Sequence, residues 1–274
     1  MDLFLLVGII VGTVAVLAGM LLKGASISIL ISPEAGLIIF VGLIAATINS
    51  YPAQEIKRVP KMLKVLFSNK EYHYAEIINQ IVELANKARK DGLLALEEPV
   101  QKLSDPFMKK GLEMVVDGVD PDEVREIMEN EIDGIEERHR VGAGIFKTAG
   151  ATAPTLGVLG AVIGLIGALG NLQNISKLGE MISSAFVATM FGIFFGYVIL
   201  IPMGSRLTVK SDQEIQALNL ILEGVLAIQS GQAPRSIEQK LNSLIAPGQR
   251  SQDQDKEGRG KIIEKKEKKR RGCI

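Results

Sequence analysis

Cysteine and histidine are almost absent from this chain of 274 residues. The one cysteine, Cys273, is followed only by Ile274, so it forms no internal disulfide and completes no C-a-a-X lipidation box. The two histidines, His73 and His139, are far apart in the sequence and make no metal-binding cluster. The GxSxG, P-loop, GxGxxG and HExxH motifs are also absent. The sequence therefore predicts no enzyme and no cofactor, and Cys273 is interpreted as an incidental free thiol in a polar tail.

A net charge is missing as well. Lysine plus arginine and aspartate plus glutamate both number 31, so the formal net charge is zero and gives no reason to propose a nucleic-acid partner. Hydrophobic residues make up 47% of the chain and charged residues 23%. Both fractions are compatible only if apolar and charged residues are segregated, and charge is indeed rare in four apolar segments.

These four segments are expected to cross a membrane. The first is Leu3–Leu22, which lacks the basic start of a signal peptide, and the second covers about 33–50. The third and fourth form a hairpin within 149–203, each about 23 residues long, without any Asp, Glu, Lys, Arg or His. The sequence therefore predicts an all-α integral membrane protein with four transmembrane helices.

Lysine and arginine positions predict the orientation of the spans. The cations near the inner ends of the spans are Lys57, Arg58, Lys61, Lys64, Arg138, Arg140, Lys147, Arg206 and Lys210. The two short loops hold only Lys23 and Lys177. By the positive-inside rule, both termini and the long middle segment are expected to be cytoplasmic.

The chain is expected to have five regions. They are spans one and two (1–50), a helical cytoplasmic domain (51–148), spans three and four (149–205), cytoplasmic helices (206–245) and a disordered basic tail (246–274). The tail could touch anionic lipid, but we interpret it as a flexible segment without a fixed partner.

Helix signals are clear in the middle region. An amphipathic pattern predicts a helix that ends at Gly92, and Asp105 followed by proline predicts the start of a second. Asp120 opens a capping box before a long helix that continues towards the third span, with Gly142 and Gly144 as possible flexible points.

Polar residues inside the hairpin indicate more than an anchor. Pro154 frees a backbone carbonyl one turn earlier, and with Thr152 and Thr155 it predicts a patch of uncommitted oxygens that Thr189 could face. Such a patch can ligate or pass a small cation. No carboxylate is present here, so another polypeptide must bring the titratable group if an ion crosses.

Small residues follow one face of each hairpin span. They are Gly157, Gly160, Ala161, Gly164, Gly167 and Ala168 in the third span, and Ala185, Thr189, Gly192 and Gly196 in the fourth. Such stripes mark close helix packing in lipid, which four spans could satisfy alone, although stripes on two helices favour a homo-oligomer. The hydroxyls of Ser183 and Ser184 are expected to bond carbonyls of their own helix.

The charged run from Arg89 to Glu98 has two interpretations. Charge alone favours an exposed turn of mixed sign at a helix end. The functional alternative is a protein-docking surface that presents both signs on a short ordered element.

Four stretches are similar to those of a known family: ARKDGLLALEE, DGVDPDEVREIMENEIDGIEERH, TAPTLGVLGAVIGLIGALGNL, and SSAFVATMFGIFFGYVILIP with the later LILEGVLAIQSGQAPRSI. Through them, over roughly residues 1–245, the chain resembles the A-type stator subunits of the bacterial flagellar motor, MotA and PomA, of the MotA/TolQ/ExbB proton channel family. The order of two spans, a cytoplasmic region and two more spans is the stator layout.

The resemblance implies a subunit of the bacterial inner membrane that converts ion flow into torque on the flagellar rotor. It implies a homo-oligomeric ring, a pentamer, around a pair of B-type subunits, MotB or PomB. Each B subunit supplies the ion-binding aspartate on one membrane helix and a peptidoglycan-binding domain. Arg89 and Glu97 match charged residues that contact the rotor switch protein FliG, and Lys90 and Glu98 match residues that assist this contact.

The resemblance also implies an ion pathway. Thr155, Phe186 and Thr189 match residues that surround the partner's aspartate. Pro154 matches the proline at the cytoplasmic start of the third span, and Pro202 the proline that ends the fourth.

One departure from the family concerns the ion. Sodium-type members carry a threonine where this chain has Ala161, which favours protons, although the retained Thr189 could still ligate sodium. Two other functions stay open at this point. One is a TolQ- or ExbB-like channel subunit that energises envelope proteins, whose relatives have three spans and an outward N-terminus. The other is a passive membrane scaffold in which the glycine stripes only pack.

Overall fold

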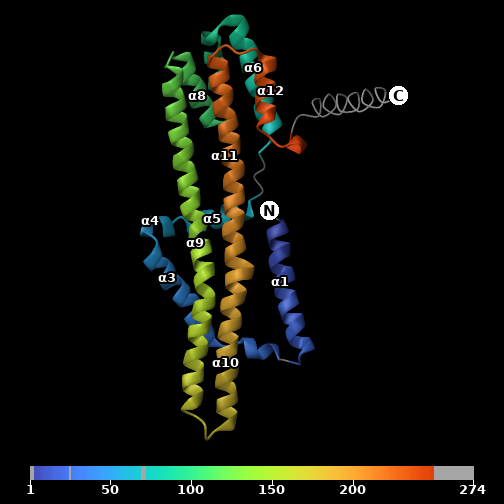
Figure 1. Ribbon diagram of the computed structural model, residues 1–274, viewed down its shortest axis with the longest axis vertical. Helices are drawn as coiled ribbons and strands as arrows, with labels where there is room; N and C mark the ends of the chain where they lie inside the picture. Colours follow the sequence, from blue (N-terminus) through green and yellow to red (C-terminus); the bar gives the residue numbers. More distant parts are fainter. Residues whose placement is uncertain (1–2, 25, 69–71, 250–274) are drawn as a thin grey trace, which may run out of the picture. The chain divides into compact units, whose positions relative to one another are not determined.

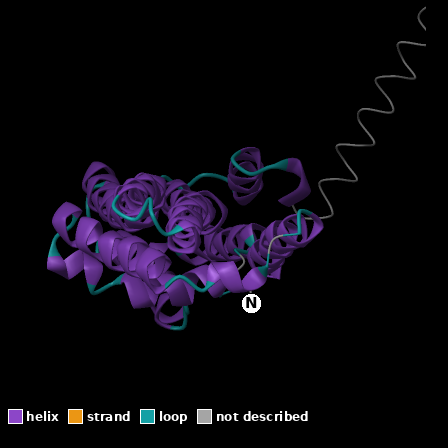
Figure 2. Cartoon of the chain, turned by 90° about the horizontal axis from the view of Figure 1, so that it is seen from below, coloured by secondary structure: helices purple, strands orange, loops and turns teal. Residues whose placement is uncertain are grey.

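The computed structural model describes residues 3–24, 26–68 and 72–249. Within these ranges the chain forms only helices joined by loops and turns (Figure 2). Four helical segments are long and apolar enough to cross a membrane, so the predicted all-α fold with four spans is confirmed. The basic tail from residue 250 on, with Cys273, lies outside the described residues.

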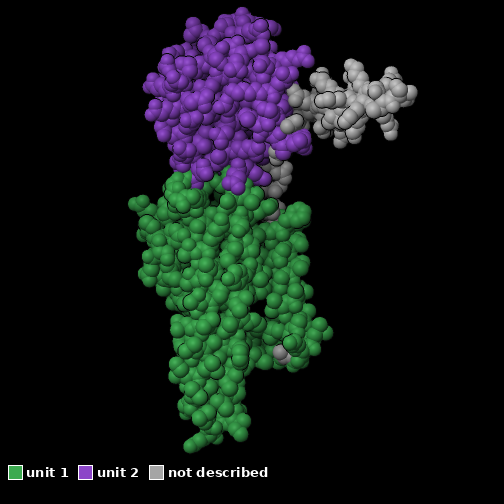
Figure 3. All heavy atoms as spheres, viewed as in Figure 1, with its two compact units in different colours: residues 1–70, 137–211 green, residues 71–136, 212–274 purple. Residues whose placement is uncertain are grey.

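The chain divides into two compact units (Figure 3). Unit 1 comprises Met1–Lys70 and Glu137–Ser211, and unit 2 comprises Glu71–Glu136 and Asp212–Ile274. Two long helices contribute residues to both units: α9, Pro121–Leu169, and α11, Ile201–Gln229 (Figure 1). The spans of the hairpin therefore continue, without a break in the helix, into the segments predicted to be cytoplasmic.

Unit 1 contains the four apolar spans. Its other elements are α1 (Leu3–Leu22), η1 (Ile27–Leu30), α2 (Pro33–Gly36), η2 (Leu37–Val41), α3 (Gly42–Ser50), α4 (Ala53–Ile56), α5 (Val59–Phe67), α10 (Ile175–Ile193) and η4 (Phe194–Leu200). The elements α2, η2 and α3 follow one another directly and make up the second span. That span begins where it does because the Ser32 side chain accepts a hydrogen bond from the Ala35 N–H and Pro33 occupies the first turn.

Unit 2 is a helical bundle around a single apolar core. Besides its parts of α9 and α11, its elements are α6 (Tyr74–Asp91), η3 (Leu93–Leu96), α7 (Glu97–Gln101), α8 (Pro106–Val116), α12 (Pro234–Ser243) and η5 (Pro247–Gln249). The predicted boundaries are confirmed: α6 ends at Gly92, with φ of 85°, and α8 begins after Asp105. The Asp105 carboxylate accepts hydrogen bonds from the N–H groups of Phe107 and Met108, which α8 could not otherwise satisfy.

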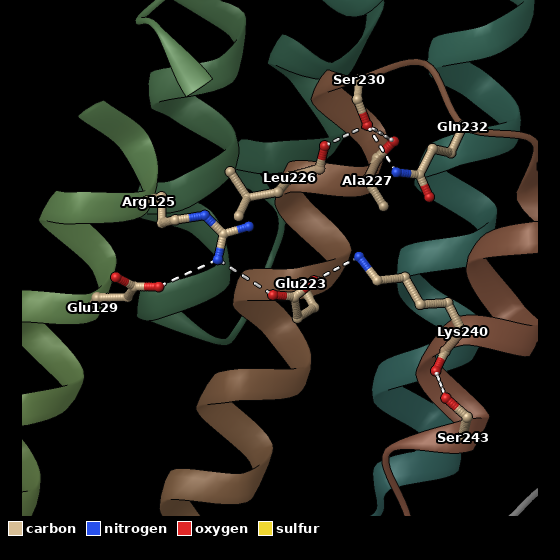
Figure 4. A network of polar contacts seen from close by, with 9 residues as sticks. All are labelled: Arg125, Glu129, Glu223, Leu226, Ala227, Ser230, Gln232, Lys240 and Ser243. Carbon is tan, nitrogen blue, oxygen red and sulfur yellow. Dashed lines mark hydrogen bonds and ion pairs between the residues drawn. The ribbon is translucent and has the colours of Figure 1, made fainter. Parts of the chain in front are cut away.

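An ion-pair network joins three helices of unit 2 (Figure 4). Glu223 of α11 accepts hydrogen bonds from Arg125 of α9 at 3.4 Å and from Lys240 of α12 at 2.6 Å. Arg125 also contacts Glu129 on its own helix, at 3.2 Å. Burial alone would raise the pKa of Glu223, but the hydrogen bond and charge of Lys240, with those of Arg125, outweigh it and hold that pKa below its ordinary value.

The two glycines expected to be flexible points lie inside α9, which runs through both without a break. A Cβ added at Gly142 would lie 2.8 Å from the terminal methyl of Met62, and one at Gly144 would lie 3.1 Å from the Tyr51 hydroxyl. The small residues are therefore used for close packing against the segment that follows the second span, which periodicity could not show.

Candidate functional site

The glycine stripe of the third span faces the other arm of the same hairpin. A Cβ added at Gly160 would lie 2.8 Å from the Ala188 Cβ, and one at Gly164 would lie 2.8 Å from the Ala185 Cβ. A Cβ added at Gly157 would lie 3.0 Å from the Ala188 carbonyl oxygen of the α10 backbone. The faces of these glycines are therefore packed against α10 of the same chain, so the stripes of small residues by themselves do not require a second copy of the chain.

Both arms of the hairpin depart from regular α-helix at the level of Pro154. This proline lies inside α9 and has no N–H, so the carbonyl of Gly150 loses its helical partner. On the facing arm, η4 is a π-helical segment that contains Gly196. A Cβ added at Gly196 would lie 2.5 Å from the Gly150 carbonyl oxygen and 3.1 Å from the Pro154 Cδ. The freed carbonyl is therefore covered by the backbone of the opposite helix.

Sequence reasoning missed Gly150 and the π-helical turn. The signal that was available is the spacing of Gly150 and Pro154, four residues apart, on one arm and of Gly192 and Gly196 on the other. A Cβ at Gly192 would lie only 2.5 Å from the Ala153 carbonyl oxygen. Four-residue spacings of this kind place small residues on one helix face, but only the structure shows which backbone they meet.

The hydroxyls near Pro154 do not form the expected patch of uncommitted oxygens. Thr152 donates to the Thr148 carbonyl of its own helix at 2.9 Å. Thr189 lies within 3.3 Å of the Gly157 carbonyl oxygen and 3.4 Å of the one of Ala185, so it bonds across the hairpin or along its own helix. The prediction of an uncommitted hydroxyl is therefore wrong for Thr152, because the carbonyl four residues earlier is always within reach of a threonine hydroxyl in a helix.

Thr155 is different from Thr152, three positions earlier. It is exposed on the surface of unit 1, and no hydrogen bond of its hydroxyl occurs among the residues that the structure describes. Phe186, also exposed at 68%, lies next to Ala185, which meets α9 at Gly164. Thr155 and Phe186 are thus more than two helical turns apart along the hairpin, which separates two residues that were expected to surround one group.

The remaining candidate residues of the ion pathway are half-buried. Ala161 lies on α9 between the packed glycines. Pro202 is the second residue of α11, the helix that follows η4 directly. A proline cannot donate to the preceding turn, so Pro202 coincides with the end of the π-helical segment.

Ser184 does not bond its own helix as expected. Its hydroxyl lies 2.8 Å from that of Ser32, the residue that caps the second span. A hydroxyl on a neighbouring helix competes successfully with the i−4 carbonyl because it can act as donor or acceptor. Next to this pair lies a cavity of about 310 Å³, whose lining includes the charged side chains of Glu34, Lys177 and Glu180.

The charged run of unit 2 spans the connection between α6 and α7, which consists of Gly92 and η3. Arg89 and Lys90 end α6, Glu97 and Glu98 begin α7, and all four side chains are exposed. Cations at a helix C-terminus and anions at an N-terminus are favoured by the helix dipole, so the local structure explains the signs without a partner. Because these side chains are exposed, their positive and negative charges are nevertheless accessible to another protein.

The two glutamates differ in their surroundings. Glu98 pairs with Lys102 one turn later, and this hydrogen bond and charge hold the pKa of Glu98 below its ordinary value. The pair is exposed and therefore contributes little to stability. Glu97 lines a cavity of about 230 Å³ together with Glu113 and Asp117.

Comparisons with known proteins agree over most of the sequence. The model of the family described as "Motility protein A N-terminal" matches residues 6–92, and the model of the "MotA/TolQ/ExbB proton channel family" matches residues 100–219. Motility protein A of Bacillus subtilis is 47% identical over 242 residues, which are 88% of this chain and 90% of that protein. The chain belongs to the MotA/TolQ/ExbB proton channel family.

Solved structures support the same assignment. The flagellar MotAB stator complex of Bacillus subtilis matches with a TM-score of 0.81 and 50% identity, over 86% of this chain and 93% of that one. The structure of Campylobacter jejuni (C. jejuni) MotAB matches with a TM-score of 0.86 and 33% identity, over 92% and 100%.

These relatives confirm the predicted class of function. The chain is a membrane-embedded stator subunit of the flagellar motor from an ion-channel family, and not an enzyme. The match of the N-terminal motility protein A description to residues 6–92 favours the stator over the TolQ- or ExbB-like alternative. The individual roles of the candidate residues stay predictions.

Proposed function

We propose that copies of this chain form a ring, a pentamer, around a pair of B-type subunits in the bacterial inner membrane, with both termini in the cytoplasm. Ion flow between the ring and the B-type subunits would then generate torque on the rotor. One observation carries this proposal: the exposed surface of the two apolar spans, 149–171 and 181–203, presents Thr155, Phe186 and Tyr197 but no carboxylate. A pathway of this kind needs a carboxylate from another chain. The names of the two solved relatives support such a partner, because both are MotAB structures.

On this proposal Thr155 faces the partner's aspartate. The close packing of Gly196 against Gly150 and Pro154, and the contact of Thr189 with Gly157, keep the hairpin rigid behind it. A hydroxyl can accept or pass a proton and can ligate a sodium ion, so the site suits either ion. Ala161, as a small apolar residue, favours protons. Phe186, Pro202 and the exposed apolar surfaces around them would contact the B helix, neighbouring copies and membrane lipid.

The rotor-facing element would be the turn between α6 and α7. Arg89 and Glu97, with Lys90 and Glu98 beside them, present both signs of charge to the switch protein FliG. Complementary charges mainly set the encounter and orientation of two proteins, which suits a contact that forms and breaks during rotation.

The ion pathway is tested by two matched threonine variants. Thr155→Val removes an exposed hydroxyl without changing shape, whereas Thr152→Val removes one that only bonds its own helix. In cells that carry the variant as their only A-type subunit, we expect T155V to reduce swimming speed severely and T152V to leave it nearly normal. Normal swimming of T155V at normal expression would count against the proposed pathway.

The rotor surface is tested separately. Arg89→Glu and Glu97→Lys should each reduce torque while ion flux through the assembled stator stays intact. Glu83→Lys changes an equally exposed charge of α6 away from the turn and serves as the control. Equal losses in all three variants would contradict a specific rotor contact.

A further inference from the structure

The short helices α4 and α5, just after the second span, and the two residues between them carry an excess of positive charge. Residues 53–67 contain four cations, Lys57, Arg58, Lys61 and Lys64, and a single carboxylate, Glu55. Glu55 pairs with Arg58 at 2.8 Å. The three lysines are exposed, and none of them has an ion pair within the part of the chain that the structure describes.

The opposite face of α5 is bound to the ends of the membrane spans. Leu66 is fully buried and packs in one cluster with Phe146 of α9 and Met203 of α11, to which Leu5 of α1 also belongs. Leu5 lies in the first turn of its span, and Met203 lies three residues before Arg206, the first charged residue after the fourth span. In Figure 1, α5 runs across the direction of α1 and α9 near the start of α1. The helix α5 is therefore held where the apolar spans end.

A cation from another helix fixes the end of α5. Lys210 of α11 donates to the carbonyl oxygens of Val65 at 2.9 Å, Leu66 at 2.8 Å and Ser68 at 2.6 Å. Val65 and Leu66 belong to the last turn of α5 and Ser68 is its C-cap, so Lys210 adds a cationic donor to carbonyls at the end of the helix, where helical partners run out. The helix is thus locked both by apolar packing and by a charge-assisted cap, so its lysine face has a defined direction.

We propose that Lys57, Lys61 and Lys64 form a binding surface for the headgroups of anionic phospholipids in the leaflet next to α5. Lysines beside an anionic membrane surface each add to its attraction, and that attraction falls within a Debye length. Lys61 and Lys64, three residues apart, lie on one face of α5, and Val65, 50% exposed, lies beside Lys64. Lys57 is the C-cap of α4, two residues before α5 begins. The apolar face of α5 is buried in protein, so the surface holds headgroups by charge without inserting into the lipid.

The experiment uses the full chain in nanodiscs that contain phosphatidylcholine with or without phosphatidylglycerol. Phosphatidylglycerol retained by the protein is counted by native mass spectrometry. The triple variant K57Q/K61Q/K64Q should retain about tenfold less phosphatidylglycerol than the unchanged chain, and added salt should weaken binding by the unchanged chain. Retention of phosphatidylcholine should not change.

Three further variants make the result specific. K87Q/K109Q/K110Q removes the same number of cations from unit 2 and should bind lipid normally. A chain that ends at Gln249 lacks the basic tail and should also bind normally. K57R/K61R/K64R keeps the charge and should retain binding, which separates a charge effect from a folding defect. The proposal is overturned if the glutamine variant binds phosphatidylglycerol normally, or if removal of the tail abolishes binding.

Discussion

At the scale of single residues, the structure separates side chains that the sequence treats as alike. Thr152 and Thr155 are the same residue type in the same span, yet only Thr152 bonds its own helix. Gly8 and Gly196 are both glycines in apolar spans, yet a Cβ meets nothing within 4 Å at the first and a carbonyl oxygen at 2.5 Å at the second. What a residue contributes here depends on which atoms face it across the hairpin.

Gly196→Ala tests the packing of the hairpin. The added methyl must displace the backbone of the facing helix, so we expect a loss of about 1–3 kcal/mol of stability. The thermal midpoint in detergent, followed by circular dichroism, should fall clearly. Gly8→Ala adds the same methyl to an open helix surface and should leave the midpoint unchanged or slightly higher. If both variants behave alike, the close contact between Gly150 and Gly196 is not important for stability.

At the scale of elements, helix ends depend on short-range hydrogen bonds and helix faces on long-range packing. Asp105 caps α8 through its own side chain, a feature that proline at the next position made predictable. The cap of α5 by Lys210 comes from a residue 142 to 145 positions away and had no local signal. Local sequence rules therefore predicted the start of α8, but they could not predict the contact of Lys210 with the end of α5.

Asp105→Ala tests the local cap. Two N–H groups at the start of α8 would lose their acceptor, which costs about 1 kcal/mol. Hydrogen–deuterium exchange should show faster exchange at Phe107 and Met108 than in the unchanged chain. Asp105→Asn keeps an acceptor oxygen and should largely restore protection. Equal exchange in the alanine variant and the unchanged chain would argue against the cap.

The network around Glu223 makes unit 2 sensitive to acid. Because the pKa of Glu223 is lowered in the folded chain, its contribution is full above the ordinary pKa of about 4.3 and is lost as the pH falls through the lowered value. Glu223→Gln should therefore reduce stability at neutral pH, by about 0.5–1 kcal/mol for this partly exposed group.

The difference between Glu223→Gln and the unchanged chain should shrink as the pH is lowered below about 4. Thermal midpoints measured over a pH series check this. Glu129→Gln removes only the pair with Arg125 on the same helix and should have a smaller effect. If the difference in thermal midpoint between Glu223→Gln and the unchanged chain does not depend on pH, the charge of the Glu223 carboxylate is not the source of the stabilisation.

At the scale of the whole molecule, four spans require both termini to lie on one side of the membrane. The sequence offers a natural reporter, because Cys273 is the only cysteine. In spheroplasts, a membrane-impermeant maleimide should leave Cys273 unmodified until the membrane is permeabilised. In a Cys273→Ser background, a cysteine introduced by Gln173→Cys, in the loop between α9 and α10, should react without permeabilisation. Labelling of Cys273 in sealed spheroplasts would overturn the proposed orientation.

The sequence by itself determined the four spans, the cap at Asp105 and the end of α6 at Gly92, because each depends on neighbours within a few residues or on bulk apolarity. The family resemblance added the class of function. Only the tertiary structure decided that the Thr152 hydroxyl is hydrogen-bonded within its own helix, that Ser184 bonds Ser32 and that Gly150 faces Gly196. These contacts join residues of different helices, or choose among several partners in reach. Periodicity identifies a helix face, but the three-dimensional packing selects the atoms that meet it.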